Sequence, residues 1–134
     1  MMAEVSTHDN LVLLMERWVC SNLLMGDQGR ILCDLPHRKT PPRIGNNVPD
    51  LYVSAYHDIP FILGEAKTAV DIETKRSHEQ IATFLRHCDK VLPSRLILAV
   101  PWYKVPYARN LLRILIELHK ITGVEALVLE NLPG

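Results

Sequence analysis

Two short runs of β-favouring residues, separated by four residues, constrain the fold of this chain more than any other feature. The first run covers residues 51–56 and the second covers residues 61–66. Between them stands His-Asp-Ile-Pro, a sequence typical of a tight turn. The two runs therefore predict an antiparallel hairpin, in which the start of the first strand and the end of the second are neighbours.

The rest of the chain alternates helical and extended patterns around this hairpin. Apolar residues at helical spacing predict helices over 8–25, 71–90 and 105–121, and short apolar runs predict strands over 31–35, 95–100 and 125–129. The prolines of residues 36–49 predict a loop. The resulting order, αβββαβαβ, is that of an α/β protein with a mixed central sheet flanked by helices. Because no linker or repeat divides the chain, we expect a single domain over residues 1–134.

Composition and charge argue against several classes of protein. A formal net charge of zero argues against a surface that grips nucleic acid over its whole area. No apolar run approaches the roughly 20 residues that cross a bilayer, so we expect no membrane partner. Glu4, His8 and Asp9 stand where an export signal carries basic residues. The cysteines are far apart, which fits a reducing compartment and predicts a cytoplasmic protein.

Charged residues stand at the two neighbouring ends of the predicted hairpin. Asp50 precedes the first strand, and Glu65 and Lys67 close the second with their side chains on one face. This edge predicts a Mg²⁺ site beside a cation, with Asp50, Glu65 and the backbone carbonyl of Ala66 as ligands. Such a site can hydrolyse phosphodiesters, because the metal activates water and Lys67 stabilises charge in the transition state. The alternative is an exposed ion pair at a strand end.

With this order of helices and strands, the residues Pro49-Asp50 and Glu65-Ala66-Lys67 resemble the PD-(D/E)xK nuclease superfamily. The resemblance covers roughly residues 8–130. It implies a restriction-endonuclease-like fold and a deoxyribonuclease that cleaves DNA with Mg²⁺ or Mn²⁺. It also implies that Asp50 and Glu65 are metal ligands and that Lys67 is the catalytic lysine.

Two further positions match accessories of that family. Some members place a catalytic glutamine in the helix after Glu-x-Lys, followed by an aromatic residue, as Gln80 and Phe84 are placed here. Gln80 could instead close a capping box with Ser77, and Phe84 could be a core residue. Other members add a metal-binding glutamate from the first helix, where this chain has Glu16. That side chain either points into the site or faces solvent.

Basic residues near the predicted site are candidates for nucleic-acid binding: Arg38, Lys39 and Arg43 in the proline-rich loop, and Lys75 and Arg76 at the second helix. They could contact phosphates, or they could be solvated surface charge. A domain of this size has little surface for holding a duplex, so a homodimer or a larger complex could complete the site. The alternative function is a nuclease fold that binds DNA or assembles with little or no catalysis.

Overall fold

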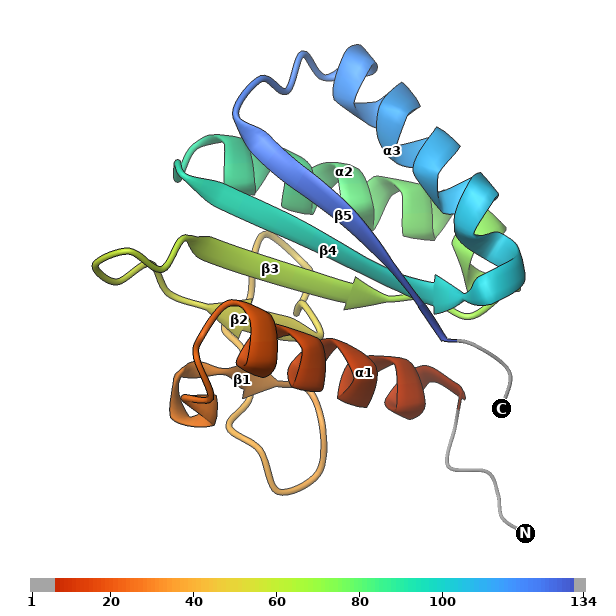
Figure 1. Cartoon of the computed structure of the whole chain (residues 1–134). Helices are drawn as coiled ribbons and strands as arrows, with labels where there is room; N and C mark the ends of the chain where they lie inside the picture. Colours follow the sequence, from red (N-terminus) through yellow and green to blue (C-terminus); the bar gives the residue numbers. More distant parts are fainter. Residues whose placement is uncertain (1–6, 132–134) are drawn as a thin grey trace, which may run out of the picture.

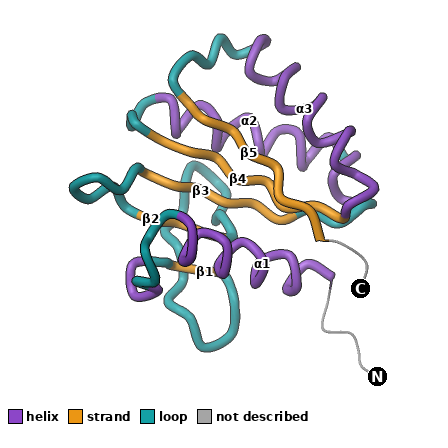
Figure 2. The backbone as a smooth tube through the Cα atoms, viewed as in Figure 1, coloured by secondary structure: helices purple, strands orange, loops and turns teal. Residues whose placement is uncertain are grey.

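The computed structural model describes residues 7–131 as three α-helices packed on a five-stranded sheet (Figure 1, Figure 2). The helices are α1 (Thr7–Asn22), α2 (Lys75–Asp89) and α3 (Val105–Leu118), and the strands are β1 (Leu32–Cys33), β2 (Leu51–Val53), β3 (Phe61–Ala66), β4 (Ser94–Pro101) and β5 (Val124–Asn131). Short 3₁₀ turns cover Gln28–Arg30, Asp71–Glu73 and Trp102–Lys104. Glu4 and both ends of the predicted domain lie outside the described residues.

The sheet is mixed, and its strands lie in space in the order of the chain. β1 with β2 and β2 with β3 pair antiparallel, whereas β3 with β4 and β4 with β5 pair parallel. Parallel neighbours require crossover connections, which α2 and α3 supply. α1 covers one face of the sheet, and α2 and α3 cover the other (Figure 1). The predicted α/β class, with a mixed sheet flanked by helices, is confirmed.

The side chains of β3 alternate between the two faces of the sheet, and this alternation determines which helices each side chain packs against. All six residues of β3 are buried. Phe61 and Leu63 belong to the hydrophobic cluster under α2 and α3, whereas Ile62 and Ala66 belong to the cluster under α1. Because side chains two positions apart on a strand share a face, Glu65 lies on the α2 side of the sheet.

Gly64 allows α1 and β2 to approach β3 closely beside Glu65. A Cβ atom at this position would lie 3.0 Å from the Cβ of Leu51 and 3.0 Å from the Sδ of Met15. Both neighbours are fully buried, so there is little room for them to move away. The glycine therefore sets the spacing of the layers next to the charged end of β3.

Several predicted boundaries are wrong by a few residues. β2 ends at Val53, and the turn that follows is closed by backbone hydrogen bonds of 3.0 and 2.8 Å between Tyr56 and Ile59. α2 begins at Lys75, not at residue 71, because Thr74 is its N-cap and accepts the backbone N–H of Ser77 at 3.1 Å. The alternative prediction that Gln80 closes a capping box with Ser77 is therefore wrong. The Gln80 side chain is available for other contacts.

None of the helices within residues 7–131 combines the length and the apolar content needed to cross a bilayer. The cysteines Cys20, Cys33 and Cys88 are free thiols, and burial raises the pKa of Cys33 and of Cys88 to about 12. Both buried thiols are therefore protonated and inert at neutral pH.

Candidate active site

Asp50 and Glu65 lie next to each other at the end of the β2–β3 hairpin, where their carboxylates form hydrogen bonds between the two strands. Leu51 pairs with Gly64, which places Asp50 beside Glu65 at the next position. The backbone N–H of Asp50 donates to Oε1 of Glu65 at 3.3 Å, and the backbone N–H of Ala66 donates to Oδ2 of Asp50 at 2.8 Å. The predicted convergence of the two hairpin ends is therefore present, with each carboxylate bonded to the opposite strand.

Lys67 follows β3 directly and lies between β3 and α2. Its Nζ is 3.2 Å from Oε2 of Glu65 and donates a hydrogen bond to Oε1 of Gln80. Nε2 of Gln80 in turn donates to Oδ1 of Asn47 at 3.1 Å. The backbone N–H of Lys67 donates to the carbonyl of Ala99 at 3.0 Å, which continues the β3–β4 ladder by one residue. β3, β4 and α2 thus each provide one contact of this lysine, and the loop residue Asn47 in turn holds Gln80.

The side chains of Asp50, Glu65, Lys67 and Gln80 line a cavity of about 470 Å³ at the carboxyl end of β3, the central strand of the sheet. Its walls are formed by His8, Asp34, Val48, Asp50, Glu65, Lys67, Asp71, Thr74, Arg76, Ser77 and Gln80. Asp50, Glu65 and Lys67 are only 5%, 5% and 8% exposed. The alternative that Glu65 and Lys67 form an exposed ion pair is therefore wrong.

His8 joins the site from the first turn of α1. Its Nε2 lies 3.2 Å from Oδ2 of Asp50, and its Nδ1 lies 3.6 Å from Oδ1 of Asp9. The hydrogen bond to Asp50 raises the pKa of His8 to about 9, although partial burial lowers it. His8 is therefore protonated at neutral pH. No local pattern in the sequence links it to Asp50, 42 residues away.

The electrostatics of the cavity are those of two crowded carboxylates. Burial, followed by the neighbouring charge of Asp50, raises the pKa of Glu65 far above its usual range. Lys67 acts in the opposite direction and lowers that pKa. In this structure Glu65 consequently holds a proton more tightly than an ordinary glutamate does. A cation brought to these oxygens would favour the ionised form.

Glu16 is not one of the side chains that line this cavity. It is 3% exposed, and Arg38 donates to both of its carboxylate oxygens, from Nε at 2.7 Å and from Nη2 at 3.0 Å. Those hydrogen bonds lower the pKa of Glu16. The solvent-facing alternative is wrong, because a cation from the proline-rich loop compensates the burial of this carboxylate.

Only one of the candidate nucleic-acid-binding residues, Arg76, lines the cavity. Arg38 forms an ion pair with Glu16, and Lys39 is an exposed loop residue. Nη1 of Arg43 lies 3.5 Å from the backbone oxygen of Asn46. Lys75 lines a different groove, between α2 and α3. Phe84 is fully buried in the core under α2, as its alternative interpretation expected.

The site combines hard oxygen donors, three cationic groups (His8, Lys67 and Arg76) and an amide. Within the described residues, no set of three or more His, Cys, Asp and Glu side chains is arranged to hold a metal ion. Comparisons with protein-family models, with curated proteins and with solved structures find no match. The chemistry of the site is therefore argued from its own geometry: Asp50 and Glu65 present carboxylate oxygens to the cavity, and Lys67 and Arg76 present cationic groups.

Proposed function

We propose that this chain is a Mg²⁺- or Mn²⁺-dependent nuclease that hydrolyses phosphodiester bonds in DNA. One observation supports this most strongly: Asp50, Glu65, Lys67 and Gln80 line one cavity at the carboxyl end of β3. We also propose that the chain belongs to the PD-(D/E)xK nucleases and has a restriction-endonuclease-like version of the α/β fold. Its free thiols suit the cytoplasm, which is the location we propose.

The donor chemistry of the site fits a hard divalent cation. Carboxylate and carbonyl oxygens are the ligands that Mg²⁺ prefers, and Asp50, Glu65 and the carbonyl of Ala66 would supply them. Burial penalises the ionised form of Glu65, so a cation at its oxygens would relieve an unfavourable charge. A bound metal ion would polarise a phosphoryl oxygen and activate water for attack.

The remaining side chains have roles that follow from their contacts. Gln80 accepts a hydrogen bond from the ammonium of Lys67, which also pairs with Glu65, and the two contacts together fix the position of that charge. An ammonium fixed at the edge of the cavity can stabilise negative charge that develops on the phosphoryl group. Arg76, exposed on the first turn of α2, is placed to contact a neighbouring phosphate.

A cleavage assay tests the proposal. The substrates are supercoiled, linear, single-stranded and branched DNA, each with and without Mg²⁺. Asp50→Ala, Glu65→Ala and Lys67→Ala are each expected to abolish cleavage, with circular dichroism showing that the fold is retained. Glu79→Ala, on the exposed side of α2, is the control and should cleave normally. Cleavage that survives all three site changes rejects the proposal.

A second function is favoured by the internal bonds of the carboxylates. Oδ2 of Asp50 is already bonded to Ala66 and lies beside His8, and both oxygens of Glu65 have partners. Carboxylate oxygens that already have partners inside the protein are less available to a metal ion. Such a site suits a nuclease-fold module that binds DNA or assembles with little or no catalysis. Calorimetric titration with Mg²⁺ and Mn²⁺ separates the two: metal binding that Asp50→Asn removes supports the nuclease, and a folded protein that binds neither metal supports the module.

A further inference from the structure

The outer edge of the sheet is formed by a long strand without a strand neighbour on one side. β5 pairs with β4 along all eight of its residues, and it is the last strand in the order of the sheet. In the part of the chain that the structure describes, no strand pairs with its other edge. Such an edge presents unpaired N–H and C=O groups, and proteins usually protect it with proline, lysine or a bulge. β5, with the sequence Val-Glu-Ala-Leu-Val-Leu-Glu-Asn, contains no proline and no lysine.

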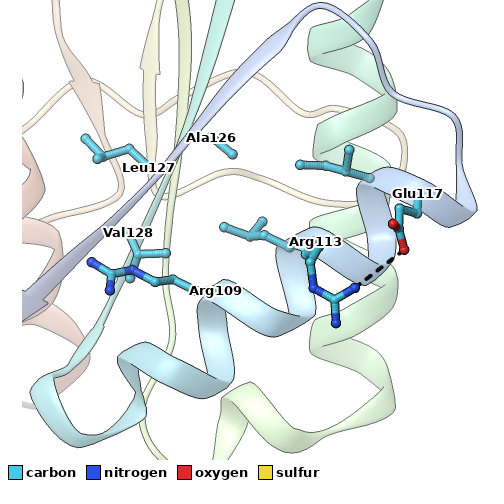
Figure 3. A pocket seen from close by; sticks show the side chains of 8 residues that line it. Arg109, Arg113, Glu117, Ala126, Leu127 and Val128 are labelled. Carbon is cyan, nitrogen blue, oxygen red and sulfur yellow. Dashed lines mark ion pairs between the residues drawn. The ribbon is translucent and has the colours of Figure 1, made fainter.

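An apolar groove of about 470 Å³ runs between β5 and α3 (Figure 3). Its floor is formed by Leu112, Ile116, Ala126 and Val128, which pack on the core under α2 and α3. Its outer wall is formed by the exposed charges of α3: Arg109, Arg113 and Glu117. Figure 3 shows the side chains of Arg109 and Val128 among those that line the groove, and the ion pair in which Nη1 of Arg113 lies 3.6 Å from Oε1 of Glu117.

We propose that a second copy of this chain covers this surface, with the two β5 strands paired antiparallel about a two-fold axis perpendicular to the sheet. Such an axis keeps both α3 helices on the same face. Residues directly opposite in a strand pair must share a face, so the register is restricted. Leu127 opposite Leu127 of the second copy satisfies this condition, and it places Ala126 opposite Val128 and no glutamate opposite another glutamate.

The charges on α3 are complementary to themselves under the same axis. When the two helices lie antiparallel with Leu112 opposite Ile116 of the second copy, position 111 lies opposite position 117. Glu117 of the second copy then stands between Arg109 and Arg113 of the first, and the relation holds in both directions. Because the surface carries both signs in this order, a second copy fits it, whereas a purely acidic or purely basic partner does not.

This dimer doubles the sheet and places the two candidate sites far from one another. Each site lies at the end of β3, two strands inward from β5. Five strand spacings separate the two β3 strands, which is roughly 24 Å across the sheet. The antiparallel arrangement also puts the two sites at opposite ends of the sheet, so each works alone.

Charge exchange tests the interface in the full chain. Wild type should sediment at twice its mass of 15.3 kDa. Arg109→Glu/Arg113→Glu and Glu117→Arg should each weaken self-association by at least about tenfold, because like charges then face each other. An equimolar mixture of these two variants should form a heterodimer, since each charge again meets its opposite. Leu127→Lys, which brings two lysines together at the axis, should also give monomers. Glu79→Arg, the same charge change on α2, should leave the dimer intact.

Two results overturn the inference. A wild-type chain that remains monomeric at high concentration contradicts it directly. A dimer that none of the α3 or Leu127 changes weakens would use another surface. Because the charge variants change only exposed side chains, their circular dichroism spectra should match that of wild type, and a failure to pair then reports on the interface itself.

Discussion

The carboxylate of Asp50 accepts the backbone N–H of Ala66 at 2.8 Å, and the carboxylate of Glu65 accepts the backbone N–H of Asp50 at 3.3 Å. Asp50 and Glu65 thus each satisfy a buried backbone group of the opposite strand. The two carboxylates hold the hairpin end together and also form the site. Changes at Asp50 should therefore affect both stability and any metal-dependent activity.

Asp50→Ala and Asp50→Asn should separate these two roles. The alanine leaves the buried N–H of Ala66 without an acceptor, which should lower the free energy of unfolding by about 1–3 kcal/mol. The asparagine keeps an acceptor oxygen, so its loss should be smaller, while its missing charge should still abolish cleavage. Urea denaturation and a cleavage assay measure the two effects. Equal losses of stability would show that the bond to Ala66 matters little.

Gln80→Leu tests whether the position of the Lys67 ammonium matters for cleavage. The change removes the oxygen that accepts from Lys67 and leaves the ion pair with Glu65 in place. We expect a loss of rate of up to about 100-fold, because a misplaced catalytic charge stabilises the transition state poorly. Metal affinity, measured by calorimetry, should be unchanged. Full activity in Gln80→Leu, equal to that of the exposed control Glu79→Ala, would rule out this positioning role.

The sequence was sufficient to predict the α/β class and the pairing of strand ends. The alternation of residues 61–66 decides that Glu65 faces the same side as Leu63, and the short turn decides that Asp50 is its neighbour. These are consequences of local periodicity. The start of α2 was predicted too early because a 3₁₀ turn, Asp71–Glu73, directly precedes the helix, and only the structure shows that Thr74 caps it.

Long-range partners could not be predicted in the same way. His8 meets Asp50 across 42 residues, Gln80 meets Asn47 across 33, and Arg38 meets Glu16 across 22. Each contact depends on how a loop or a helix end lies on the sheet, which no periodic pattern encodes. A charged residue in an apolar helix, as Glu16 is, was the one available signal. It was expected either to face solvent or to point into the site, and instead it is buried and paired with Arg38, which remains partly exposed.

The Glu16–Arg38 pair should contribute mainly to stability. Arg38→Met should lower the urea midpoint markedly, because it leaves the carboxylate of Glu16 buried without a cation. Adding Glu16→Leu to that variant should restore part of the loss, since the unpaired charge is then removed. Lys39→Met, at the next and exposed position, should have no effect. If Arg38→Met instead weakened DNA binding at full stability, Arg38 would be a phosphate contact.

The stability of the protein should fall as the pH rises above neutrality. The folded state raises the pKa of His8 from 6.5 to about 9, chiefly through the hydrogen bond to Asp50. Folded protein therefore binds this proton more tightly than unfolded protein does. The stabilisation is complete below pH 6.5 and is lost as the pH rises through about 9. The raised pKa of Glu65 acts in the same direction, since its proton also favours the folded state.

His8→Gln isolates the histidine part of this dependence. Urea denaturation at several values between about pH 6 and pH 9 should show a shallower decline in the free energy of unfolding for His8→Gln than for wild type. His57→Asn, which changes an exposed histidine in the β2–β3 turn, should keep the wild-type slope. Parallel curves for wild type and His8→Gln would mean that His8 does not hold its proton against Asp50. The decline would then have to come from Glu65 alone, and Glu65→Gln would flatten it.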